Sequence, residues 1–151
     1  FDVGGGSLDA FINGSWLTLD QKTIPTQPTL TLSGLIFYPA ESRLRGGASW
    51  TLGAFSSSAA INHVSGSTDN IVAPAADIDP WTTLDLSVRY RLPAWSAQLP
   101  GLELGLSVIN ATDQAPPFAA GAASNLEGIT YDSTNASAIG RFVAVTARQS
   151  F

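Results

Sequence analysis

The chain has no cysteine, no methionine and a single histidine, His63. Without cysteine there are no disulfides, thiolate metal ligands or cysteine nucleophiles, and one histidine cannot build a usual zinc site. Only 13% of the residues are charged and the formal net charge is −5, whereas nucleic-acid binding requires a basic surface. We therefore predict no catalytic residues, no enzyme activity, no metal, no cofactor and no nucleic-acid partner.

Long apolar runs are also missing, although 44% of the residues are hydrophobic. No run approaches the roughly 20 residues of a membrane-spanning helix, so a membrane role would have to use β-strands. The chain begins at Phe1 and shows no signal peptide. We expect a mature or partial chain, most simply the C-terminal part of a longer protein.

Alternation of apolar and polar residues dominates what is present. In the segment from Trp81 to Leu92, Leu86 and Val88 alternate with Ser87 and Arg89, which is the period of a half-buried strand. About six segments of roughly ten to thirteen residues share this pattern: Leu8 to about Asp20, Ser42 to Thr51, Phe55 to about Ser67, Trp81 to Leu92, Gly101 to Thr112, and the segment that ends at Phe151. Membrane strands need about nine to eleven residues, more than the usual soluble strand.

The connections between these segments alternate in length. Leu52 to Ala54 and Pro93 to Pro100 are short, whereas 21–41, about 68–80 and about 113–138 are long and rich in Pro, Ser, Asn, Ala and Gly. Short turns at one end and long loops at the other are typical of outer-membrane barrels. The prediction is an all-β, antiparallel, up-and-down transmembrane barrel fragment with short periplasmic turns and long extracellular loops.

Charges and aromatic residues agree with this orientation. The apolar face would contact outer-membrane lipid and the polar face would line the lumen. The charged residues predicted to face the lumen are Arg43, Arg45, Asp85, Arg89, Arg91, Glu103 and Arg148, with Asp9 on the same face. A structural role in a cross-strand charge ladder is favoured for them over binding of an anionic ligand. The aromatic residues predicted to lie at the membrane interface are Trp16, Trp50, Phe55, Tyr90 and Phe151.

Two further groups were weighed as sites. The position of His63, outward near the loop end of its strand, predicts an interfacial side chain. Asp69, Asp77 and Asp79 carry oxygen ligands that suit Ca²⁺, but their spacing matches no cation-binding loop. We expect these three aspartates to lie in a solvated loop.

Three blocks in the second half of the chain carry a family resemblance. The segment Trp81-Thr-Thr-Leu-Asp-Leu-Ser-Val-Arg-Tyr90 resembles the antepenultimate strand of TonB-dependent outer-membrane receptors. The segment Gly101 to Phe118, with its Asn-x-x-Asp and Pro-Pro-Phe groups, is similar to the next strand and loop entry. The segment Tyr131 to Phe142 is similar to the closing motif before the last strand. Together the blocks cover about a quarter of the chain, in the family's order.

The resemblance implies that residues 1–151 are the last strands of a 22-stranded barrel, without its plug domain. It implies active uptake of a scarce nutrient such as an iron–siderophore, cobalamin or an oligosaccharide. The implied partners are the TonB complex, reached through the absent plug region, and the barrel assembly machinery, which would read the C-terminal strand and Phe151. The expected location is the bacterial outer membrane. For the lumen-facing charges the resemblance implies contact with the plug, which is favoured over ligand binding. The small-molecule ligand stays open.

Two other readings explain part of the pattern. A soluble, secreted β-sandwich that binds carbohydrate or protein would explain the alternation, but not the long strands or the outward aromatic ends. A small outer-membrane enzyme or porin-like barrel is less favoured, because about six strands fall below the eight of the smallest usual barrels.

Overall fold

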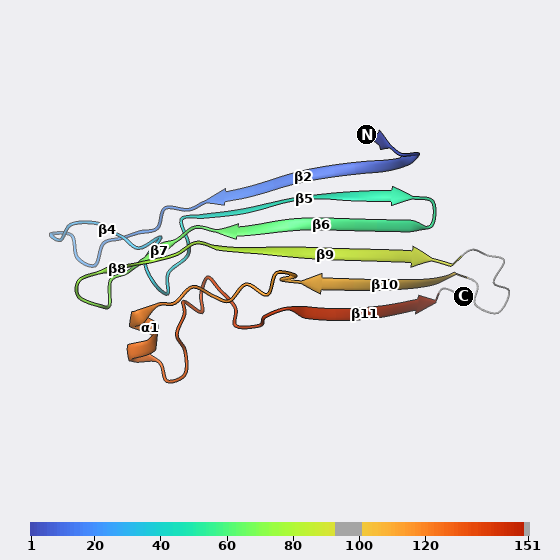
Figure 1. Cartoon of the computed structure of the whole chain (residues 1–151). Helices are drawn as coiled ribbons and strands as arrows, with labels where there is room; N and C mark the ends of the chain where they lie inside the picture. Colours follow the sequence, from blue (N-terminus) through green and yellow to red (C-terminus); the bar gives the residue numbers. More distant parts are fainter. Residues whose placement is uncertain (93–100, 150–151) are drawn as a thin grey trace.

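The computed structural model describes residues 1–92 and 101–149 (Figure 1). These residues form eleven strands and one short helix. The elements are β1 (Asp2–Val3), β2 (Gly6–Trp16), β3 (Asp20–Gln21), β4 (Leu30–Thr31), β5 (Ser42–Leu52), β6 (Phe55–Val64), β7 (Ser67–Asp69), β8 (Ala76–Ile78), β9 (Trp81–Arg91), β10 (Leu102–Ile109), α1 (Ala120–Asn125) and β11 (Phe142–Gln149).

Seven strands form one antiparallel sheet in the order β1-β2-β5-β6-β9-β10-β11. Each long strand pairs with the next long strand along the chain, so the up-and-down order is confirmed together with the all-β class. Within the described residues the sheet is open, with β11 at one edge and β1 beside β2 at the other. Figure 1 shows the long strands side by side as one extended layer.

The strand count differs from the predicted six because the chain folds back at its start. Gly4 and Gly5 have φ values of 60° and 78°. This left-handed conformation suits a two-residue hairpin turn and is easily reached only by glycine. It pairs Val3 with Gly6 and adds β1 to the sheet. Two further hairpins, β3–β4 and β7–β8, stand apart as two-stranded sheets.

Several predicted strand ends were too long. The segment from Phe55 to Ser67 is interrupted after Val64, and Asp20 belongs to the separate strand β3. The predicted strand from Gly101 to Thr112 ends at Ile109, because Asn110 has a φ of 51° and cannot continue an extended strand. The long strands therefore have 8 to 11 residues. The predicted turn 93–100 and the end of the last strand at Phe151 lie outside the described residues.

The long connections gather at one end of the sheet, on the left of Figure 1. The tight turn between β5 and β6, with Gly53 at a φ of 56°, lies at the opposite end. The three connections run over residues 17–41, 65–80 and 110–141, and their hairpins and helix α1 make a folded cap. We call this end of the sheet the cap end and the other the turn end.

The buried hydrophobic cluster lies in the cap and not on the sheet. Ile36, Ile78, Ala119 and Ala122 form its core, and each of the three connections contributes to it. Leu, Ile and Val side chains of the sheet stay largely exposed. Among residues 1–92 and 101–149, no helix has the length and apolar character needed to cross a bilayer.

Candidate functional site

The register of the sheet gives it one apolar and one polar face. The row that crosses the middle of the apolar face is Leu8, Trp50, Ser57, Val88, Leu106 and Val145. The adjacent row on the polar face is Asp9, Ser49, Ser58, Ser87, Ser107 and Ala144. Side chains alternate between faces along a strand, so each pair of neighbouring rows points in opposite directions.

The apolar face is uncovered. Ile12 is 80% exposed and Val145 is 79% exposed, and Ile61 and Leu86 are also exposed. Monomeric soluble proteins rarely expose apolar patches of more than a few hundred Å². Large exposed apolar patches usually mark surfaces that contact a protein partner, a ligand or a membrane.

Aromatic side chains lie at both ends of the apolar face. Phe55 lies opposite Tyr90 at the turn end, and its ring meets that of Trp50 in an edge-to-face pair with centroids 6.1 Å apart. Trp50 Nε1 also donates a hydrogen bond to the Val3 carbonyl at 3.0 Å. Trp16 lies at the cap end of β2 and is 75% exposed. The four predicted interface aromatics thus share one face, and Phe151 lies outside the described residues.

The polar face carries a charge network below the cap. Arg45 contacts Asp85 at 3.1 Å. Asn62, on the strand between them, accepts from Arg45 and donates to Asp85 at 2.9 Å. The backbone N–H of Asn110 donates to the other Asp85 oxygen at 3.1 Å. Hydrogen bonds of Asp85 therefore connect strands β5, β6 and β9 of the sheet to the start of connection 110–141.

A second group of charges lies at the turn end of the same face. Arg91 contacts Glu103 at 3.3 Å, and Arg148 lies opposite Glu103 in the register of β10 and β11. Arg89 lies opposite Gly105. Two separate ion pairs, Arg45–Asp85 and Arg91–Glu103, thus lie on the described part of this face. Asp9 has no arginine opposite it, because the register places it opposite Ser49.

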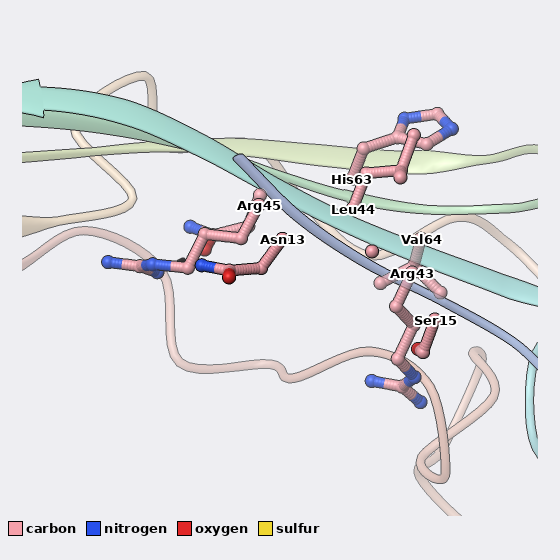
Figure 2. A pocket seen from close by; sticks show the side chains of 9 residues that line it. Asn13, Ser15, Arg43, Leu44, Arg45, His63 and Val64 are labelled. Atoms are coloured by element: carbon pink, nitrogen blue, oxygen red, sulfur yellow. Dashed lines mark hydrogen bonds between the residues drawn. The ribbon is translucent and has the colours of Figure 1, made fainter. Parts of the chain in front are cut away.

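Arg43 connects the polar face to the cap. Its Nη2 donates to Asn135 Oδ1 at 2.6 Å and to the Thr134 carbonyl at 3.4 Å. In Figure 2 the side chains of Arg43 and Arg45 lie on the same side of β5 as Asn13 and Ser15. These residues line an open hollow of about 350 Å³ at the cap end of the sheet edge.

His63 also lines this hollow, but its side chain lies on the other face of the sheet. Figure 2 shows it beside Leu44, away from the arginines. Its Nδ1 lies 2.8 Å from Thr82 Oγ1, so the ring is held on the apolar face near the cap, as the strand pattern predicted. In the described part of the chain no three His, Asp or Glu side chains gather in a way that could hold a metal ion.

The prediction of a solvated loop was wrong for Asp69. Its side chain is fully buried and accepts hydrogen bonds from the backbone N–H groups of Gly121 at 2.5 Å and Ile71 at 3.2 Å. Sequence spacing could not reveal this role because Gly121 belongs to a different connection. Asp77 and Asp79 are exposed, as expected.

The Asn-x-x-Asp group has a structural role that the sequence did not disclose. Asn110 is buried, and its side chain accepts from the Gln114 N–H at 2.9 Å and donates to the Gln114 carbonyl at 3.0 Å. Asp113 accepts from the Arg141 N–H at 2.7 Å. A Cβ on Gly140 would lie 2.6 Å from Asp113 Oδ1. The loop entry after β10 and the approach to β11 therefore fit together directly.

Asn135 and Asp132 make hydrogen bonds within the cap that sequence reasoning missed. Asp132 is buried and accepts from Asn135 Nδ2 at 2.6 Å and from the Thr134 N–H at 2.9 Å. The available signal was the Asp-x-x-Asn spacing, which is typical of a side-chain-capped turn.

Comparison of the chain with protein-family models, curated proteins and solved structures finds no match.

Proposed function

We propose that this chain is a wall segment, with its extracellular cap, of a TonB-dependent outer-membrane receptor. In that setting the apolar face contacts lipid, the polar face lines the lumen, and the cap faces the cell exterior. The receptor would take up a scarce nutrient, such as an iron–siderophore, cobalamin or an oligosaccharide, with energy delivered through the TonB complex and a plug domain. The barrel assembly machinery would insert it through its C-terminal strand.

The observation that carries the proposal is the two-faced single layer. One face exposes Ile, Leu and Val side chains, the other carries the serine row and the arginines, and the strands have 8 to 11 residues. A tilted membrane strand needs about nine to eleven residues. The exposed Trp16 at one end and the Trp50–Phe55 pair at the other match the aromatic girdles of membrane barrels.

The open edges support a larger barrel. Unpaired backbone groups are not tolerated in the hydrocarbon core, where only helices and closed barrels satisfy them. β2 and β11 point in opposite directions along the sheet, which is the arrangement that an even-stranded antiparallel barrel requires at its two flanks. The last strands of a larger barrel satisfy both conditions.

A soluble β-sandwich has less support. A sandwich needs a second sheet packed about 10 Å from the first. Within residues 1–92 and 101–149 the other sheets are the two-stranded pairs β3–β4 and β7–β8, and these belong to the cap. Nothing described there covers the apolar face.

Cysteine labelling of adjacent residues tests the proposal, since residues 1–151 contain no cysteine that would react in the background. Leu86→Cys and Ser87→Cys occupy neighbouring positions on opposite faces of β9. In outer membranes from cells that express the whole gene, Leu86→Cys should react with a lipid-soluble maleimide and resist a charged one. Ser87→Cys should show the reverse preference.

The same labelling separates the alternatives. Recovery of the protein without detergent in the soluble fraction, with equal reactivity of both cysteines toward the charged reagent, would contradict a membrane wall. The receptor assignment requires in addition that deletion of tonB abolishes uptake of the nutrient. A protein that is inserted in the membrane but independent of TonB would be a barrel of another class.

A further inference from the structure

Each of the three long connections is joined to the other two. Connection 17–41 meets connection 65–80 through a parallel bridge between Leu35 and Thr68. The Ile36 N–H donates to the Thr68 carbonyl at 2.9 Å, and the Thr68 N–H donates to the Gly34 carbonyl at 2.7 Å. Connection 65–80 meets connection 110–141 where the Gly121 N–H donates to the Asp69 carboxylate.

The third link is centred on the Asn135 side chain. Its Oδ1 accepts from the Ala40 N–H at 3.0 Å and from Arg43 at 2.6 Å. Its Nδ2 donates to the Tyr38 carbonyl at 2.7 Å and to Asp132 at 2.6 Å. A side-chain amide has two acceptor sites and two donors, so Asn135 uses its full hydrogen-bonding capacity to hold 110–141 against 17–41 and β5.

The links enclose a shared core. Ile36 comes from the first connection, Ile78 from the second, and Ala119 and Ala122 from the third. Lifting any one connection away would expose apolar groups of the other two, and separating 65–80 from 110–141 would also leave the buried Asp69 carboxylate without its Gly121 partner. Such a group is costly to leave unsatisfied. Independent motion of one connection is therefore disfavoured.

We infer that the three connections form one cooperative cap that opens and closes as a unit, with the Asn135 side chain as its latch. The latch is accessible from the polar face, because Arg43 is an exposed residue of the sheet and holds Asn135 Oδ1 directly. A hydrogen-bond acceptor that binds the Arg43 guanidinium from the polar face of the sheet would compete with Asn135 Oδ1 for it and loosen the whole cap. The inference rests on contacts within the chain and holds in a membrane or in solution.

Hydrogen exchange followed by mass spectrometry tests the cooperativity in the full-length protein. Asn135→Ala should accelerate exchange by about tenfold or more in all three connections. This includes 65–80, to which the Asn135 side chain makes no hydrogen bond in the described structure. Asn125→Ala is the matched control, because the Asn125 amide bonds only within α1, to Gly121 and Ser124. It should leave 17–41 and 65–80 unchanged.

A second variant guards against failure of the first to fold. Asn135→Asp keeps the acceptor oxygens but removes both Nδ2 donors and places a carboxylate beside Asp132, and it should produce the same pattern. Acceleration confined to 17–41 and 110–141 would overturn the cooperative cap. Equal acceleration in β6 and β9 would also overturn it, because the cap would then not open separately from the sheet.

Discussion

The carboxylate of Asp69 accepts a hydrogen bond from the backbone N–H of Gly121 at 2.5 Å, across 52 residues of sequence, and both residues are buried. This contact fixes connection 110–141 against 65–80. A Cβ on Gly121 would overlap the Asp69 carboxylate, so glycine is required here because of the close approach.

Gly121→Ala should destabilise the protein by about 1–3 kcal/mol, because the added methyl group forces the buried carboxylate out of place. In an open helix the same change would stabilise by about 0.5–1 kcal/mol. The sign of the change in unfolding free energy, measured by denaturant titration, is therefore decisive. Ser124→Ala, an exposed change in the same helix, should stay within about 0.5 kcal/mol of zero.

Asn110 tests the loop entry after β10. Its φ of 51° is tolerated by asparagine and glycine but is strained for alanine by roughly 1–2 kcal/mol. Both Asn110→Gly and Asn110→Ala lose the two bonds to Gln114. Thermal unfolding should therefore rank stability as native, then Gly, then Ala. Equal stability of the two variants would show that the left-handed backbone is not maintained.

Two acidic residues of the polar face, Asp85 and Glu103, should differ in their contribution to stability. The side chains of Asp85 and Glu103 are 21% and 29% exposed, so burial alone does not separate them. Asp85→Asn disturbs bonds to Arg45, Asn62 and the Asn110 N–H and should cost about 1–3 kcal/mol.

Glu103→Gln is the matched change, since it disturbs only the contact with Arg91 among the described bonds of that side chain. It should cost less than about 1 kcal/mol and less still at high salt. Unfolding of both variants at low and high ionic strength measures the difference. A larger effect for Glu103→Gln would indicate that the charge at the turn end is the more important one.

The two faces can be tested by inserting one charge on each. Under the proposed membrane location, Leu106→Arg places a cation on the lipid face, where it costs about 2–4 kcal/mol near the midplane. Ser107→Arg places the same cation on the polar face one residue away. The fraction of heat-modifiable, folded protein in the outer membrane should fall for Leu106→Arg and be retained for Ser107→Arg. Equal loss in both would contradict a lipid-facing side for Leu106.

Strand alternation was sufficient to predict the long strands of the sheet and their two faces from the sequence. The period of two along β9 and β10 assigns Leu86 and Leu106 to one face and Ser87 and Ser107 to the other, and the register agrees. The prediction is reliable where the two faces differ strongly in polarity. It is weaker at the strand ends, where Phe142 and Ile109 lie on the polar face near the cap.

The cap could not be predicted in this way. Its composition of Pro, Ser, Asn and Gly describes a loop equally well with or without a core. Only the tertiary structure shows that Asp69 meets Gly121, that Asn135 meets Arg43, and that Ile36 packs with Ile78. The sequence thus determined the strands and their faces, because these follow from local periodicity. The folded structure decided the cap, because its links join residues far apart in the chain and depend on how the three connections are brought together at one end of the sheet.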